Sequence, residues 1–229
     1  MPLPPDYYQK RRDDIADLVP KSARRVLDVG CAEGVLGPML FERGAKEVIG
    51  IELVPEVAKR ARKRLTRVLC GDVSTMRLPK TLGSFECIVL ADVLEHVTDP
   101  GAVLGRLLPH LAADGMIVAS IPNVRHHSVL SMLADGSWTY QDAGIMDRGH
   151  LRFFTFKEIK LLFESVGLEI RGLFGRIDPE YEQARAAGEG KAAVDLTFGR
   201  VTLRQMTPSE VVELYLSQYV FTAGRRPAA

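Results

Sequence analysis

A short acidic and glycine-containing segment of this chain is suited to holding a polar ligand. It reads Asp28-Val29-Gly30-Cys31-Ala32-Glu33-Gly34 and directly follows the apolar pair Val26-Leu27. Glycine has no Cβ, so the backbone can turn sharply there and approach a ligand closely. Tight turns from a strand into a helix present backbone N–H groups, and open α/β sheets hold nucleotide-like ligands on such turns. We therefore predict a ligand-binding turn formed by Asp28, Gly30, Cys31, Ala32 and Gly34.

Further acids follow the next apolar runs of the chain. Glu52 ends the run Val48–Ile51, 24 residues after Asp28, and Leu53 comes next. A carboxylate in this position can accept hydrogen bonds from both hydroxyls of a ribose. Asp72 and Val73 follow a third apolar run, where the alternative is that Asp72 only closes a Gly-Asp turn. Ala91, at the end of a fourth run, is predicted to line the same site.

The segment that follows Ala91 carries three side chains that can bind a metal. Asp92, Glu95 and His96 are spaced i, i+3 and i+4, so on a helical turn they share one face. A divalent metal held there would lower the pKa of a substrate hydroxyl and fix its orientation. The alternative is metal-free, with the Glu-His pair packed beside the ligand and orienting the loop.

Histidines in two later segments are candidate general bases. We select His150 and His126, with His127 as a further base or metal partner, because the pKa of imidazole suits proton removal near neutral pH. The arginines nearby could grip a phosphate or carboxylate in a bidentate manner, or could simply fix neighbouring acids; they are Arg125, Arg148 and Arg152.

These residues must be positioned by alternating strands and helices, a pattern typical of a parallel sheet covered on both faces. We predict an α/β fold with a seven-stranded, mostly parallel sheet whose last strand is antiparallel, and with helices on both faces. The strands are expected at 25–29, 48–51, 69–73, 86–90, 115–121, 168–174 and 218–223. Helices are expected at 7–19, 36–43, 55–67 and 100–111, and after capping boxes at 155–158 and 207–210.

Two segments are longer than ordinary connections. Residues 123–152 follow the fifth strand at the edge where ligands bind in such sheets, so we predict that they form a lid. Residues 176–206 form a second insertion with Ala- and Gly-rich stretches, and we expect residues 180–191 to be its mobile part. This second insertion could also support a homodimer.

The motifs around the glycine turn resemble those of a known enzyme class. The acid before Gly30 and the gap to Gly34 are similar to the first motif of class I (Rossmann-like) S-adenosylmethionine-dependent methyltransferases, and Glu52 and Asp72 follow in register. The resemblance implies S-adenosylmethionine as the cofactor, with Asp72 bonded to the adenine amino group. Asp92-x-x-Glu95-His96 resembles a segment of the ubiquinone-biosynthesis O-methyltransferases and part of the metal site of small-RNA 2′-O-methyltransferases. That likeness implies a divalent metal such as Mg²⁺ as the alternative to a histidine base.

The later segment His150-Leu151-Arg152-Phe153-Phe154-Thr155 resembles a bacterial subgroup of small-molecule methyltransferases often encoded among sugar-modifying enzymes. The implied reaction is methyl transfer to a hydroxyl, in preference to an amine, of a small molecule such as a sugar or another polar metabolite. Two alternatives stay open. One is an RNA methyltransferase that uses the basic run Lys59–Arg64, and the other is a cofactor-binding subunit that serves a partner enzyme without catalysis of its own. The resemblance does not identify the acceptor.

Composition sets broad limits on these readings. The 229 residues fit one domain, 1–229, and a formal net charge of +1 argues against a general nucleic-acid or anionic-membrane binder. There is no apolar run long enough for a membrane span and no apolar segment typical of a secretion signal. The three cysteines lack metal-type spacing, which predicts buried, reduced thiols in a cytoplasmic protein.

Overall fold

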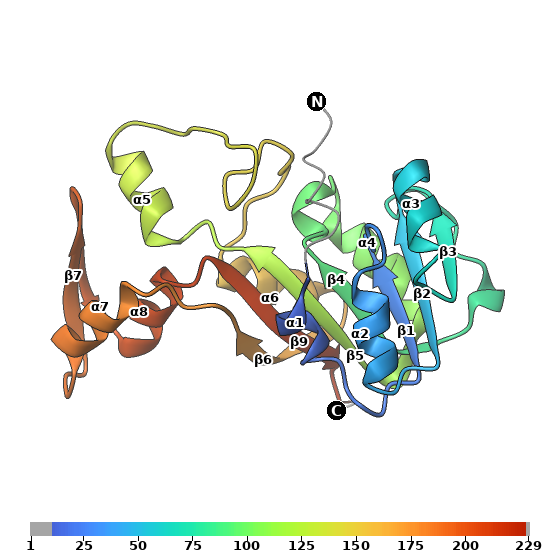
Figure 1. Cartoon of the computed structure of the whole chain (residues 1–229). Coiled ribbons are helices and arrows are strands. Elements are labelled where there is room, and N and C mark those ends of the chain that lie inside the picture. The colour runs from blue at the N-terminus through green and yellow to red at the C-terminus, as the bar shows by residue number, and fades with distance from the viewer. Residues whose placement is uncertain (1–10, 228–229) are drawn as a thin grey trace.

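The computed structural model describes residues 11–227 and contains a central sheet of seven strands (Figure 1). In spatial order they run β3-β2-β1-β4-β5-β9-β6. The first five pair in parallel, whereas β9 is antiparallel to both β5 and β6. This confirms the predicted mostly parallel sheet with an antiparallel last strand. The strands are β1 (Arg25–Val29), β2 (Glu47–Glu52), β3 (Arg67–Cys70), β4 (Phe85–Ala91), β5 (Leu111–Pro122), β6 (Leu168–Phe174) and β9 (Gln218–Arg225).

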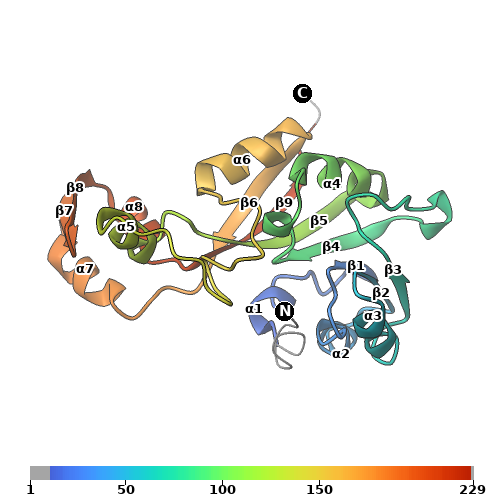
Figure 2. The same cartoon turned by 90° about the horizontal axis from the view of Figure 1, so that it is seen from above.

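Helices cover both faces of the sheet, because strands in its centre are apolar on both sides. Figure 2 shows α1, α2 and α3 on one face and α4 and α6 on the other. Each face has its own apolar core, one centred on Ile15, Leu40 and Ala58 and the other on Leu104 and Phe163. The helices are α1 (Asp13–Ala16), α2 (Leu36–Glu42), α3 (Pro55–Ala61), α4 (Pro100–Leu107) and α6 (Phe156–Ser165).

Several helices are shorter than their sequence patterns predict. Within residues 11–19, the described part of the helix expected at 7–19, the α-helix spans Asp13–Ala16; residues 7–10 lie outside the described residues. The basic helix ends at Ala61 rather than at Arg67, where β3 already begins. The helix expected to reach Leu111 ends at Leu107 and continues as a 3₁₀ turn over Leu108–His110. Pro109 lies in that turn and has no N–H to donate to an α-helical hydrogen bond.

The two insertions fold together into a small layer beside the sheet, seen on the left of Figure 1. We call it the insertion layer; it comprises α5 (His127–Ala134), α7 (Tyr181–Gly188), the hairpin β7 (Val194–Phe198)–β8 (Val201–Met206), and α8 (Pro208–Leu214). Most of the range 180–191, which was expected to be the mobile part of the second insertion, is occupied by α7, and its mobility stays a prediction. Ala184, Leu196 and Met206 are buried against α8, and this burial stabilises the helix and the hairpin.

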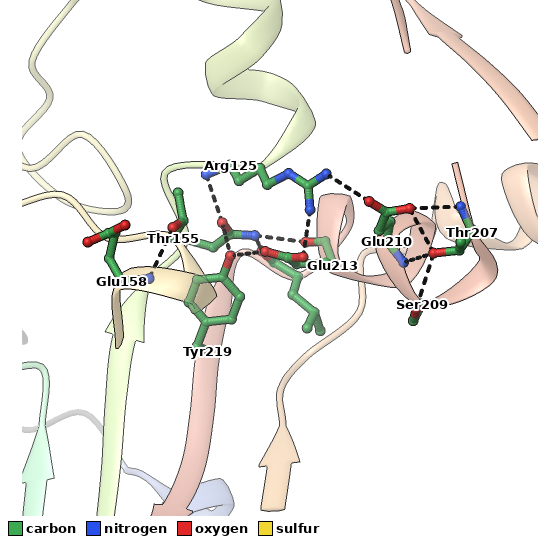
Figure 3. A network of polar contacts seen from close by, with 10 residues as sticks. Arg125, Thr155, Glu158, Thr207, Ser209, Glu210, Glu213 and Tyr219 are labelled. Carbon is green, nitrogen blue, oxygen red and sulfur yellow. Dashed lines mark hydrogen bonds and ion pairs between the residues drawn. The ribbon is translucent and has the colours of Figure 1, made fainter. Parts of the chain in front are cut away.

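Polar contacts attach the insertion layer to the sheet where β5 ends (Figure 3). The buried Asn123 amide donates to the carbonyl oxygens of Glu213 and Leu216, both at 2.8 Å. The Tyr219 hydroxyl lies 2.6 Å from Asn123 Oδ1 and from Glu213 Oε1. Arg125 forms an ion pair with Glu213 at 2.6 Å. The start of the lid is therefore fixed to α8 and β9.

Candidate functional site

A cavity of about 910 Å³ opens at the carboxyl ends of β1, β4 and β5. Parallel strands reverse their order between β1 and β4, and open α/β sheets bind ligands at such a point. One wall is the turn after β1 and another is the segment after β4, while Asp142, Asp147 and His150 come from the predicted lid segment. The volume lies in the range of about 300–1,000 Å³ that is typical of small-molecule sites.

The glycine turn after β1 has an unusual backbone. Gly30, Ala32 and Gly34 have φ of +69°, +48° and +73°, in the left-handed region that L-residues rarely adopt. Two N–H groups of the turn, those of Gly30 and Cys31, donate to the carbonyl of Ile51 on the neighbouring strand. A Cβ on Gly30 would lie 2.8 Å from Val93 Cγ2. The turn is thus held close against β2 and against the segment that follows β4, and its residues line the cavity.

We expect Gly30→Ala to raise the Kd for S-adenosylmethionine at least about tenfold. An alanine in the left-handed region costs roughly 1–2 kcal/mol, and relief of the contact with Val93 would displace the turn. Gly105→Ala is the matched control, because no atom lies within 4 Å of a Cβ placed there on α4. Calorimetric titration of both variants measures the difference. Equal affinities in the two variants would contradict the assigned role of the turn.

Asp28 lies at the cavity wall with its carboxyl group buried. Burial, and then the negative charge of Glu52, raise the pKa of Asp28 to about 7. The folded chain therefore binds a proton at Asp28 more tightly than the unfolded chain, in which an aspartate pKa is about 3.9. Ionising this group destabilises the ligand-free fold.

This shift predicts how the stability of an Asp28→Asn variant depends on pH. The proton-linked contribution of Asp28 is fully present below pH ~4 and is lost as pH rises to about 7. Asparagine does not ionise, so we expect the variant to gain stability relative to the parent across that interval, by up to about 4 kcal/mol. Urea unfolding of the two ligand-free proteins at pH 5 and pH 8 measures the difference in their free energies of unfolding. A constant difference between the two proteins would refute the shift.

Glu52 is buried at the end of β2, where its carboxylate orders the glycine turn. Its oxygens accept the N–H of Ala32 at 3.0 Å and the N–H of Val54 at 2.8 Å. Of the residues predicted to bind cofactor, the cavity wall contains Asp28, Gly30, Cys31, Ala32 and Ala91, whereas Gly34, Glu52, Leu53, Asp72 and Val73 are not on it.

Asp72 Oδ1 accepts the N–H of Ser74 at 2.7 Å and so closes a local turn; the adenine contact of Asp72 stays a prediction. Leu53 is exposed and Val73 is buried. Cys31 and Cys87 are buried, but Cys70 is exposed, so the expectation of three buried thiols is wrong for Cys70. Cys70 is the last residue of β3, which is an edge strand of the sheet.

Arg12, which no sequence pattern singled out, forms one side of the cavity. Its guanidinium pairs with Asp92 at 2.5 Å and also donates to Ser120 and Gln218. Asp92 in turn accepts from Ser120 Oγ at 2.8 Å and from the Gln218 amide. Asp92 is therefore neutralised by an arginine that lies 80 positions earlier in the chain.

Glu95, His96 and His150 converge at the cavity instead of the predicted set of Asp92, Glu95 and His96. Their ligand atoms all lie within 4.8 Å of one another. The segment forms a 3₁₀ turn over Leu94–His96 rather than an α-helical turn, and Asp92 is held by Arg12. Glu95 is 1% exposed, and neither carboxylate oxygen has a hydrogen-bond partner among the described residues. Burial and the charge of Asp92 raise the pKa of Glu95 well above its usual value.

Both histidines of this cluster expose the same ring nitrogen. His96 Nδ1 lies 3.0 Å from the carbonyl of Gly149, and His150 Nδ1 lies 3.0 Å from that of Ile145. A carbonyl only accepts, so each Nδ1 carries the proton and each Nε2 is free to accept a proton or bind a metal. Burial lowers the pKa of His150, so its ring is neutral at pH 7.

His126, the other predicted base, is not on the cavity wall. It is buried in the insertion layer and bonds to Asp178 at 2.8 Å. The three arginines serve structural contacts: Arg125 pairs with Glu213, Arg148 pairs with Asp142, and Arg152 donates to the carbonyl of Thr98. Of the two predicted bases, His150 lies on the cavity wall and His126 does not; a catalytic role for His150 stays a prediction.

The sheet order, the glycine turn and the acid that ends the second strand define a class I, Rossmann-like methyltransferase of the S-adenosylmethionine-dependent type. Residues 6–173 match a family model described as a methyltransferase domain. The chain belongs to this methyltransferase family. The match ends within β6, so the second insertion, α8 and β9 lie outside it.

Relatives in sequence include enzymes named as ubiquinone biosynthesis O-methyltransferases. The one from Xylella fastidiosa (strain 9a5c) is 30% identical over 191 residues, covering 76% of this chain and 73% of the relative. The one from Neisseria meningitidis (strain Z2491) is 27% identical, covering 74% and 71%. An S-adenosylmethionine-dependent methyltransferase structure from Mesorhizobium loti superposes with a TM-score of 0.61 at 16% identity, covering 93% of this chain and 96% of that one. At that identity the structural match shows the fold alone.

Proposed function

We propose that this enzyme transfers a methyl group from S-adenosylmethionine to a hydroxyl of a small polar molecule. The donor carries an electrophilic methyl on a sulfonium, and the residues suited to hold it are those of the glycine turn, with Glu52 on the ribose and Asp72 near the adenine. Support for a fit comes from the left-handed turn, where a Cβ on Gly30 would clash with Val93. The O-methyltransferase relatives favour oxygen over nitrogen as the acceptor atom.

The observation that carries the proposal is His150 in the cavity with its Nε2 unprotonated. A hydroxyl placed beside Nε2 can pass its proton to the ring while the oxygen attacks the methyl carbon. The lowered pKa of His150 keeps the ring in the neutral form that this step needs. The rest of the rate enhancement comes from alignment of donor and acceptor and from exclusion of water by the lid segment.

A metal-assisted variant of the same reaction is favoured by one specific observation. Glu95 is a buried carboxyl group without a partner among the described residues, and His96 and His150 offer free Nε2 atoms beside it. These three side chains would hold a divalent ion, which would lower the pKa of a bound hydroxyl. Two imidazoles and one carboxylate suit a transition-metal ion better than the Mg²⁺ that the resemblance implied. His150 would then be a ligand rather than a base.

Turnover with a library of acceptors tests the proposal. We expect formation of S-adenosylhomocysteine to be stimulated by a hydroxylated small molecule, with a mass gain of one methyl group in the product. The library should contain sugars, phenolic acids and amines. A folded protein that binds the donor but is stimulated by none of them would favour the reading as a cofactor-binding subunit. Failure to bind the donor at millimolar concentration would overturn the proposal.

The RNA alternative receives less support from the structure. Two arginines of the basic run are engaged on Glu33, Arg60 by an ion pair at 2.7 Å and Arg64 through the backbone carbonyl at 3.1 Å. These two arginines therefore hold Glu33, which lies within the glycine turn. RNA binding that weakens steeply with salt, and is lost on reversing the charges of Lys59–Arg64, would restore this alternative.

A further inference from the structure

A second group of potential metal ligands lies in the insertion layer, outside the cavity. His126 Nε2 is 2.8 Å from Asp178 Oδ2, and His127 Nε2 is 3.8 Å from the same oxygen. All three ligand atoms lie within 4.8 Å of one another. None of these residues is on the cavity wall that holds Glu95, His96 and His150. The two clusters are therefore separate sites.

The backbone holds these three side chains in place. Asp178 N–H donates to the carbonyl of Tyr215 at 2.9 Å, and Ile177 forms an isolated bridge with Leu216. His126 is the N-cap residue of α5, and its N–H donates to the carbonyl of Asn123. The ring of His127 packs 4.8 Å from that of Tyr215, measured between centroids. The ligand atoms thus face one another without any need for the chain to rearrange.

One potential ligand atom of this cluster lacks a hydrogen-bond partner among the described residues. His127 Nε2 is a buried ring nitrogen with no hydrogen-bond partner in the described part of the chain. Leaving such an atom unpaired is destabilising, so native folds usually satisfy it with a protein group, water or an ion. His126 Nδ1 accepts the backbone N–H of Ser128 at 3.3 Å, so Nε2 carries the ring proton and donates it to Asp178 at 2.8 Å. A bound metal ion would replace that proton between His126 Nε2 and Asp178 Oδ2.

We propose that His126, His127 and Asp178 bind Zn²⁺ and that the ion joins the two insertions of this methyltransferase. Two imidazole nitrogens and one carboxylate are a common donor set for tetrahedral zinc, and a water would complete the coordination. Mg²⁺ is a poor fit because it prefers oxygen ligands. The two histidines come from the first insertion and Asp178 from the second, so the ion cross-links segments 51 positions apart. Such a link stabilises the insertion layer because the ion binds the folded site and not the unfolded chain.

The test is zinc binding by the full chain in a His150→Ala background, where the cavity cluster lacks a ligand. We expect one Zn²⁺ per chain by calorimetry, and Co²⁺ substituted at the site should give the visible absorption of a four-coordinate ion. Adding His127→Ala or Asp178→Asn should weaken binding at least about tenfold, since loss of even an outer-shell partner costs 10–100-fold. The matched control is His110→Ala, a buried histidine whose Nδ1 bonds to the carbonyl of Gly83.

Limited proteolysis provides a readout that is independent of the absorption. Zn²⁺ should slow cleavage within residues 176–206 in the His150→Ala chain and leave the rate unchanged once His127 is also replaced. Circular dichroism establishes that each variant is folded, and His96→Ala serves as the alternative background if His150→Ala is not. Absence of a bound ion at micromolar Zn²⁺ in the His150→Ala chain would overturn the proposal. Binding that is equal with and without His127→Ala would overturn it as well.

Discussion

In the His150→Ala variant we expect kcat to fall about 10²–10⁴-fold, with the Kd for S-adenosylmethionine changed less than about threefold. His150 has its Nδ1 proton committed to the Ile145 carbonyl, so Nε2 is the atom available to remove a proton from the acceptor. The donor is proposed to bind at the glycine turn and not to His150, so binding of the donor should persist in the variant. Single-turnover kinetics with saturating donor, beside a calorimetric titration, separates the two quantities.

His110→Ala is the control for a general effect of losing a buried histidine, because His110 makes the same kind of Nδ1 contact with Gly83 far from the cavity. It should retain the parental kcat. A His150→Ala enzyme with parental kcat would remove this residue from the mechanism altogether.

The pH profile and a chelator distinguish a base from a metal ligand. Burial lowers the pKa of His150, so a base would remain neutral at pH 7, and the rate should fall only as pH drops through a value below ~6.5. Activity should then survive a chelator, and Glu95→Gln should be tolerated. If instead a bound metal ion activates the acceptor hydroxyl, the chelator should abolish activity and Mg²⁺ or Mn²⁺ should restore it. Glu95→Gln should then be as damaging as His150→Ala.

Replacing Glu52 by alanine is expected to raise the Kd for S-adenosylmethionine about 100-fold. The carboxylate accepts the N–H groups of Ala32 and Val54 and is the group proposed to accept the ribose hydroxyls. Hydrogen bonds to a charged group contribute roughly 1.5–3 kcal/mol each, so the loss of about 3 kcal/mol corresponds to this factor. Calorimetric titration measures the affinity, and circular dichroism shows whether the fold is kept.

Glu56→Ala is the matched control, since Glu56 is an exposed acid in the first turn of α3. Its affinity for the donor should equal that of the parent chain. Because the charge of Glu52 is one of the two causes of the raised pKa of Asp28, Glu52→Ala should also move that pKa downward. A Glu52→Ala chain that binds the donor within threefold of the parent would show that the ribose contact is made elsewhere.

Local sequence patterns determined the sheet and the glycine turn. Apolar runs such as Val48–Ile51, punctuated by glycine and acids, place strand ends within a few residues because periodicity and turn chemistry act over short distances. The same patterns predicted the antiparallel last strand, the helices at Pro55 and Pro100, and the turn around Gly30. The capping box at Thr207 and Glu210 likewise forms as its residue types predict.

The second insertion was harder to predict because its stability is not local. Residues 194–206 alternate polar and apolar side chains around Gly199, which is the signal a hairpin leaves, but a lone hairpin is marginally stable. It forms here because Leu196 and Met206 are buried against α8. α8 is in turn attached to the sheet by hydrogen bonds of Asn123 and Tyr219, residues 96 positions apart.

The cofactor turn and the methyltransferase class could therefore be predicted from sequence alone, since their residues are neighbours in the chain. The cluster of Glu95, His96 and His150 could not. Arg12 neutralises Asp92, and His150 instead of Asp92 lies beside Glu95 and His96, through contacts between segments that are far apart in sequence. Only the fold brings such segments together, because spacing along the chain carries no information about which strand ends meet at one edge of the sheet.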